Sequence, residues 1–186
     1  LFLCDQNLEY IKEEKIESTH NLLLEVLLAA KHEGQSIIKD YEHLGHHNSE
    51  GICIALARSF ADIGDIVRGR DLYLGNKKEK VRLEENLRRI FKKLYDNLIK
   101  DEKNDEKIKS RYKKDDKDPH FYQLREDWWN ANRQQVWKAI TCGAKNDDKY
   151  KIIKPDGTTK DSNKGQCRCI NGDPPTNLDY VPQFLR

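Results

Sequence analysis

The stretch Ala57-Arg-Ser-Phe-Ala-Asp-Ile-Gly-Asp-Ile-Val-Arg-Gly-Arg-Asp-Leu-Tyr73 carries the clearest structural signal of the chain. The apolar residues in and just before it recur at the spacing of one helix face: Leu56, Phe60, Ile63 and Val67. Gly69 follows the last of them, as glycine often does where a helix ends. The stretch therefore predicts a helix over residues 51–68 with one buried face and a turn at Gly69.

The same helical spacing recurs in three other parts of the chain. Apolar residues line one side of residues 20–39, 79–100 and 121–141. Ser18 or Thr19 is placed to cap the start of the first of these helices. In residues 121–141 the apolar side includes Trp128 and Trp137. Trp129 lies one position off that stripe, so we expect it either to be half exposed or to pack under the charged residues 101–118.

Two segments lack this pattern. Residues 101–118 form a low-complexity charged run, which we expect to be a frayed helix extension or a mobile loop. Residues 142–175 are dominated by Asn, Asp, Gly, Lys and Pro, which indicates a long loop held by cysteines. The predicted fold class is mainly α, an antiparallel bundle of four helices with disulfide-tethered loops.

The composition is that of a helical domain with a heavily solvated exterior. Of 186 residues, 37% are hydrophobic and 35% are charged, and no apolar run approaches the ~20 residues that a bilayer span needs. The chain contains no methionine and does not begin with a signal peptide, so we expect it to be a fragment of a longer protein. The formal net charge of +2 does not require nucleic acid or another polyanion as a partner.

The chain has an odd number of cysteines, namely Cys4, Cys53, Cys142, Cys167 and Cys169. Cys167 and Cys169 lie in a polar, glycine-bearing segment, which favours structural bridges to two different partners over a redox pair. Cys142 is the natural partner for one of them, so these three are the disulfide candidates. The count alone is equally compatible with a reduced intracellular protein that carries structural thiols.

Catalytic and metal-binding signatures are missing from the sequence. It has no nucleophile-elbow, P-loop or zinc-protease motif, so we expect no enzymatic activity and no cofactor. His43, His46 and His47 could join Cys53 at a zinc ion, but their spacing matches no compact ligand pattern, and we expect no metal. Asp62 and Asp65 are interpreted as partners in ion pairs on the helix surface rather than as catalytic carboxylates.

Charge is segregated in the third helix. From Lys77 to Lys93 there are eight basic and three acidic residues, 8 − 3 giving a local excess of +5. The predicted contact residues for a sulfated glycan are Lys77, Lys78, Arg82, Arg89 and Lys93, four of which are spaced at steps of four and seven along one strip. Such a strip can hold sulfate or phosphate groups. The alternative is an ordinary solvated helix face without a ligand. Arg68 and Arg70 are expected near the start of the strip.

Five blocks, in order, resemble one protein family. They are residues 4–10 (CDQNLEY), 29–34 (AAKHEG), 52–75, 124–133 (LREDWWNANR) and 179–186 (DYVPQFLR). Together they are similar to the Duffy-binding-like domain, alpha class, of Plasmodium falciparum erythrocyte membrane protein 1 (PfEMP1). The resemblance implies the mixed-helical Duffy-binding-like fold and extracellular disulfides. It also implies that residues 1–19 end subdomain one and that residues 20–186 belong to subdomain two, without subdomain three.

The function implied by this resemblance is host-cell adhesion by a variant surface antigen on the infected erythrocyte. The implied partners are an erythrocyte surface receptor or a sulfated glycosaminoglycan such as heparan sulfate, as in rosetting, together with adjacent domains of the polypeptide and host antibodies. No nucleic acid is expected. The alternatives are an antigenically variable module that positions a neighbouring receptor-binding domain, and an intracellular helical scaffold.

The sequence departs from the family pattern at two places. Leu27 stands where the family often has a cysteine, so Cys53 is expected to lack its usual partner. The segment between Cys142 and Cys167 also lacks a further cysteine that many members carry. The disulfide pairings of the family therefore cannot be transferred directly to this chain.

Overall fold

The structure is a computed structural model that describes residues 8–43, 51–71, 78–100, 105–112, 117–156, 158–168 and 172–186. Within them the fold is mainly helical, as predicted, with one small antiparallel sheet. The helices are α2 (Thr19–His43), α3 (Ile52–Arg68), α4 (Lys78–Lys100), α5 (Asp105–Arg111) and α6 (Tyr122–Ile140). The strands are β1 (Lys149–Ile153) and β2 (Thr159–Gln166), and the short 3-10 turns are η1 (Glu13–Lys15), η3 (Leu178–Tyr180) and η4 (Gln183–Leu185).

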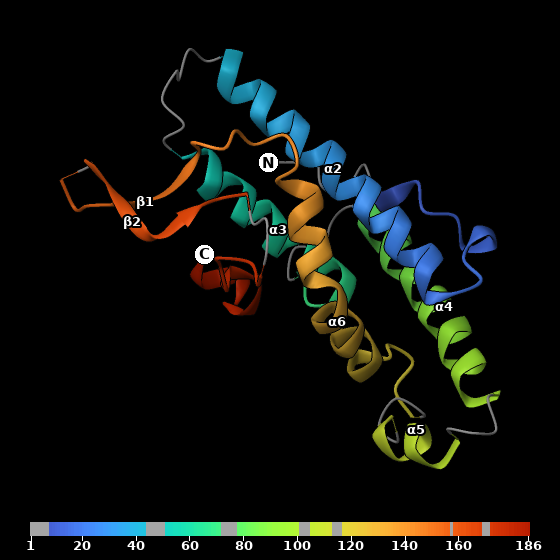
Figure 1. Cartoon of the computed structure of the whole chain (residues 1–186). Coiled ribbons are helices and arrows are strands. Elements are labelled where there is room, and N and C mark those ends of the chain that lie inside the picture. Colours follow the sequence, from blue (N-terminus) through green and yellow to red (C-terminus); the bar gives the residue numbers. More distant parts are fainter. Residues whose placement is uncertain are drawn as a thin grey trace.

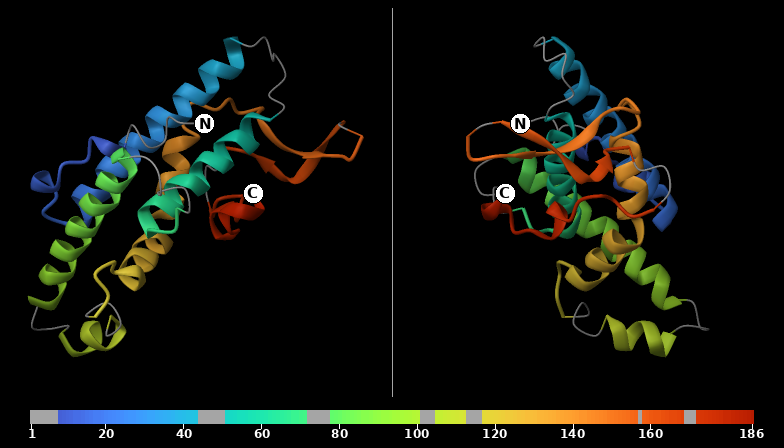
Figure 2. Two further views of the ribbon diagram at one scale, coloured as in Figure 1. Left: turned by 180° about the vertical axis from the view of Figure 1, so that it is seen from behind. Right: turned by 60° about the vertical axis from the view of Figure 1, so that its left-hand side comes forward.

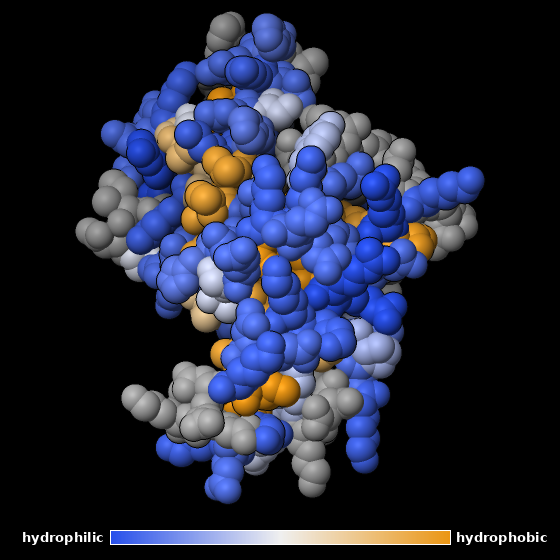
Figure 3. Space-filling view, turned by 90° about the vertical axis from the view of Figure 1, so that its right-hand side faces the viewer, coloured by the Kyte–Doolittle hydropathy of each residue, from blue (hydrophilic) through white to orange (hydrophobic). Residues whose placement is uncertain are grey.

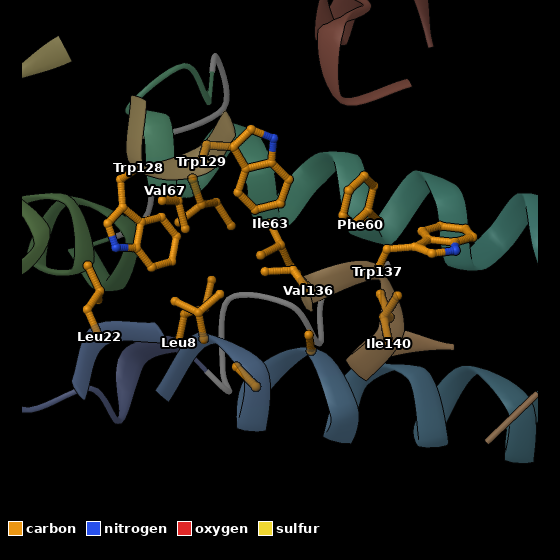
Figure 4. Packing of buried hydrophobic residues seen from close by; sticks show 14 of the residues in the cluster. Leu8, Leu22, Phe60, Ile63, Val67, Trp128, Trp129, Val136, Trp137 and Ile140 are labelled. Carbon is orange, nitrogen blue, oxygen red and sulfur yellow. The ribbon is translucent and has the colours of Figure 1, made fainter. Parts of the chain in front are cut away.

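The core lies where α2, α3 and α6 pack against one another, with α4 beside α6 and η1 (Figure 1). Figure 4 shows Phe60 of α3 among the rings of α6. The Phe60 ring centroid is 5.2 Å from those of both Trp129 and Trp137. These large buried rings are part of the apolar core between α3 and α6.

Trp129 is fully buried, so the alternative that it would be half exposed is wrong. The reason lies on α3, where Gly64 faces the indole. A Cβ atom at Gly64 would lie 2.7 Å from the Trp129 ring, closer than side chains approach one another. The absence of a side chain at Gly64 therefore creates the space that the indole fills, and its Nε1 donates a hydrogen bond to Asp179 Oδ2 at 2.9 Å.

The C-terminal end of α3 is fixed by Gly69 and Arg125. Gly69 has φ of 70°, a left-handed conformation that glycine adopts without strain. A Cβ atom there would also lie 2.9 Å from the Arg125 guanidinium. Fully buried Arg125 donates to the carbonyls of Val67 at 2.6 Å and Ile66 at 3.0 Å, and binds Glu84 of α4 through two hydrogen bonds. One side chain thus joins α3, α4 and α6.

Of the two carboxylates expected to form surface ion pairs on α3, Asp62 is half-buried and lies 3.6 Å from Arg186, whereas Asp65 is buried. Asp65 and Arg68 are only 4% and 1% exposed and pair at 3.0 Å. Arg68 also donates to the carbonyl oxygen of Asp179, and Arg133 binds the carboxylate of Asp179 at 2.7 Å. Burial lowers the pKa of Arg68, while the nearby carboxylates favour its charged form. The network joins three separate stretches, residues 57–73, 124–133 and 179–186.

Residues 142–175 were expected to form a long loop, but they contain a β-hairpin. β1 and β2 pair antiparallel, with Ile152 opposite Lys160. The base is held by a disulfide from Cys167 to Cys53, so the expected partner Cys142 is instead a free cysteine. Cys53 lies in the first turn of α3, close to the point where the hairpin returns to the helices. Cys169, the other candidate, and Cys4 lie outside the described residues.

The charged run contains a short helix, α5, that is tied back to α6. Arg111 binds the Asp127 carboxylate at 2.6 and 2.7 Å, and the Tyr112 hydroxyl lies 3.0 Å from the same group. The hydrogen bond from Arg111 lowers the pKa of Asp127. Burial, helped by Asp127, raises the pKa of Tyr112 to about 12.

This shift predicts how the docking of α5 depends on pH. A phenol whose folded pKa is raised stabilises the fold while it is protonated. Its contribution is complete below the ordinary tyrosine pKa of about 10 and is lost as the pH rises through about 12. An ultraviolet titration should show the Tyr112→Phe variant losing one late-titrating phenol. A Tyr112 phenol that titrates at the ordinary tyrosine pKa of about 10 would contradict this docking.

None of the helices in the described part of the chain combines the length and hydrophobicity that crossing a bilayer requires.

Candidate binding surface along α4

The basic strip predicted from sequence lies on the solvent side of α4. Lys78, Arg82 and Arg89 are exposed and Lys93 is half-buried, because Leu83, Leu87 and other apolar residues of α4 face the core instead. Lys77 lies outside the described residues. Arg68, expected near the start of the strip, is buried under the C-terminal segment and is not part of this surface.

The strip has a neighbour that the sequence did not reveal. The N-terminal segment at residues 8–17 folds back along α4, with Leu8, Ile11 and Ile16 buried. Asn86 Nδ2 donates to the carbonyl oxygen of Ile11 at 2.6 Å, and Asn97 Nδ2 donates to that of Glu17 at 3.2 Å. Two amides of α4 thus hold this segment beside the strip.

A groove of about 680 Å³ lies between the segment and α4. One side carries Glu9, Glu13 and Glu14, and the other carries Arg82 and Arg89 of α4. The ion pair across it, Arg89 Nη1 to Glu13 Oε2, spans 3.9 Å and is exposed. Such a pair contributes little stability, so both partners remain available to a ligand.

The charges of the groove nearly cancel. Its lining includes four carboxylates, Glu9, Glu13, Glu14 and Glu85, and three cations, Lys12, Arg82 and Arg89, giving 3 − 4 = −1. A polyanion would meet repulsion from the acidic side. A ligand that presents both signs of charge, as protein surfaces do, would be complementary to both sides.

Tyr10 supplies an aromatic contact at the groove. It lines the groove and is 78% exposed, the most exposed aromatic ring in the described part of the chain. Tyrosines at such positions are enriched among residues that dominate protein–protein binding energies. The sequence identifies Tyr10 only as part of a family block, because nothing near it in the chain shows that it lies beside α4.

A second hollow, of about 390 Å³, lies further along α4. Its lining consists of Glu85, Arg88, Arg89 and Lys92 of α4 together with Pro119 and Phe121. Arg88 Nε donates to the carbonyl oxygen of Pro119 at 3.1 Å, and Lys92 pairs with Asp96 at 2.7 Å. Cations outnumber carboxylates here, so this part of α4 is the better place for a sulfate group.

The face that includes α4 is mostly hydrophilic, with small separate hydrophobic patches (Figure 3). Among the described residues, no group of three or more His, Cys, Asp or Glu side chains could hold a metal ion. His43 ends α2 and Cys53 is in the disulfide, while His46 and His47 lie outside the described residues.

Comparison with known proteins identifies a family and several solved relatives, two of which are DBLβ domains of PfEMP1. Residues 1–186 match the Duffy binding domain family. The DBLβ domain of a P. falciparum PfEMP1, solved bound to human ICAM-1, is 40% identical over 77% of this chain and 32% of its own, with a TM-score of 0.62. The ICAM-1-binding DBLβ domain of PfEMP1 IT4var13 is 37% identical over 89% of this chain and 34% of its own, with a TM-score of 0.64.

The chain therefore spans about a third of the length of these solved domains. A comparison with curated proteins gave no match.

Proposed function

Since the chain belongs to the Duffy binding domain family, we propose that it is an adhesion module that binds a protein receptor on a host cell. The family is a non-enzymatic adhesion family, and the PfEMP1 domains that resemble this chain come from a protein of the infected-erythrocyte surface. ICAM-1 is the first receptor to test, because both solved relatives bind it.

The observation that carries this proposal is the groove between residues 9–14 and α4. Its two oppositely charged sides and the exposed Tyr10 suit a protein surface better than a polyanionic chain. Arg82 and Arg89, the strip residues that line the groove, are then contacts to a receptor's acidic side chains. Glu13 and Glu14 would contact its basic ones.

A second candidate is a sulfated glycan such as heparan sulfate, bound in rosetting through Lys78, Arg89 and Lys93 with the hollow at Arg88 and Lys92. The local excess of basic residues in that hollow favours it. Such binding would weaken steeply with salt. A third candidate is a structural module that positions a neighbouring receptor-binding domain, with the exposed charged surface recognised by host antibodies.

The class within the family belongs to the proposal as well. The sequence blocks resemble the alpha class, whereas both solved relatives are DBLβ domains. We assign the chain to the alpha class on its sequence motifs alone. On the same motifs we assign residues 1–19 to the end of subdomain one and residues 20–186 to subdomain two. The blocks that indicate the class contain Arg68, Trp129 and Asp179, which are buried and stabilise the fold. These blocks therefore do not identify the receptor.

The experiment measures binding of the purified chain to erythrocytes and to ICAM-1-bearing endothelial cells, each left untreated, treated with trypsin or treated with heparinase. We expect binding that trypsin abolishes and heparinase spares. The Arg82→Glu/Arg89→Glu variant should bind roughly tenfold more weakly, since about 1.4 kcal/mol corresponds to a factor of ten.

The matched control is Lys39→Glu/Lys138→Glu, which changes the net charge equally at exposed sites on α2 and α6. It should bind as the unchanged chain does. Loss of binding after heparinase would favour the glycan, and no binding by the folded chain to either cell type would favour the positioning role.

A further inference from the structure

The hairpin of β1 and β2 has no part in the proposed function. It projects away from the helices, and α4 lies on the opposite side of the molecule (Figures 1 and 2). In the described part of the chain, the two strands form a sheet only with each other. Each strand therefore has an outer edge that pairs with no other described strand.

The base of this hairpin is rigidly attached. The Cys53–Cys167 disulfide joins it to α3, and the Tyr150 ring stacks on the buried Trp137 at a centroid distance of 6.3 Å. Trp137 Nε1 also donates to the carbonyl oxygen of Cys167 at 3.0 Å. A strand that is already held in place loses little conformational freedom when a partner binds, which favours affinity.

The exposed surface of the hairpin is basic with one apolar residue. Lys149, Lys154 and Lys160 are exposed, and Ile152, directly opposite Lys160, is 52% exposed. The hairpin also carries two exposed carboxylates. Asp156 accepts two hydrogen bonds from Thr158, at 2.9 and 2.6 Å, and Asp161 lies opposite Lys151, so lysines outnumber carboxylates on the described hairpin. The three lysines have no ion pair within the described residues.

We propose that this hairpin is a docking site for an acidic segment of a protein partner, which binds in extended conformation as an added strand. Lysines on an edge strand repel a second copy of the same hairpin, and the same charges attract a strand that carries carboxylates. Because every second side chain of a strand points to the same face, Ile152, Lys154 and Lys160 share one face of the hairpin. An added segment can place an apolar residue on Ile152 and an acidic residue, two positions away, near Lys154. This surface is separate from the α4 groove.

The test measures fluorescence anisotropy of labelled peptides with the full chain. The probe, called the Glu-Val peptide, repeats Glu-Thr-Val-Thr, which favours an extended strand and places Glu and Val on the same face. We expect it to bind, and to bind at least roughly tenfold more weakly to the Lys154→Glu/Lys160→Glu variant. Ile152→Ser should also weaken binding. A Lys-Val peptide should not bind, and a helix-favouring Glu-Ala peptide of equal charge should bind more weakly.

The matched control is again Lys39→Glu/Lys138→Glu, which changes the net charge equally at exposed sites outside the hairpin and the α4 groove. It should bind the Glu-Val peptide normally. Because the peptide test uses no receptor-bearing cells, failure here and failure of the α4 proposal are distinguishable. No binding of the Glu-Val peptide by the folded chain would overturn the proposal. So would equal binding to the hairpin variant, equal binding of the Glu-Ala peptide, or tighter hairpin-dependent binding of heparin, which would assign the surface to a polysaccharide.

Discussion

Replacing both Cys53 and Cys167 with alanine should lower the free energy of unfolding by about 4–5 kcal/mol. The disulfide joins residues 114 positions apart, so it restricts a large part of the unfolded chain. Both sulfurs are buried, and the alanines also leave a small cavity. Urea unfolding, followed by circular dichroism with and without reductant, measures the effect.

The matched control is Cys142→Ala, which removes a half-buried free thiol and should leave the urea midpoint nearly unchanged. Reductant should destabilise the unchanged chain and this control alike, and should have little effect on the double variant. A loss below about 1 kcal/mol in the double variant would contradict the structural role given to this bridge.

Replacing Arg125 with methionine should cost about 3–5 kcal/mol, the range expected when one partner of a buried ion pair is removed. The Glu84 carboxylate would lose its bidentate partner, and the carbonyls of Ile66 and Val67 would lose their donor. Because Arg125 joins three helices, the loss should appear in the global unfolding transition rather than in local fraying.

Two comparisons separate this effect from a general loss of charge. Replacing both Arg125 and Glu84 with methionine should cost less than Arg125→Met alone, because no unpaired carboxylate remains. Arg111→Met breaks the exposed pair with Asp127 and should shift the midpoint far less. Equal effects of Arg125→Met and Arg111→Met would contradict the burial of Arg125.

The helices were predictable because their signals are local. The helix predicted over residues 51–68 is observed as Ile52–Arg68, since glycines on both sides and an apolar stripe between them define it. Ser18 is likewise the residue before α2, and its side chain and that of Asn21 exchange hydrogen bonds with the backbone of the first turn. Such patterns depend only on neighbouring residues.

The hairpin and the buried tryptophan were not predictable, because distant segments determine them. The β2 sequence TKDSNKGQ has no alternation of apolar and polar residues, and a bridge from α3 holds its end. Trp129 is buried because Gly64 makes room for it and Asp179 accepts its hydrogen bond. None of these partners is close to it in sequence.

Only the basic side of the α4 groove was predictable from the sequence. The spacing of Arg82 and Arg89 shows that they share one exposed side of a helix, but not what lies beside them. The acidic side of the groove comes from Glu13 and Glu14, some 70 residues earlier in the numbering. Their return to α4 depends on the hydrogen bond of Asn86 to Ile11 and on buried Leu8. That long-range packing changes the expected ligand from a polyanion to a protein.

Carboxylate footprinting tests the central claim, that a protein receptor is bound in the α4 groove, most directly. The chain is labelled with a carbodiimide reagent when free and when bound to receptor-bearing host cells, and labelled sites are identified by mass spectrometry. We predict that labelling of Glu13, Glu14 and Glu85 falls on binding, while exposed Asp40 on α2 is unchanged. Unchanged labelling of the three groove carboxylates on the bound chain would contradict the claim.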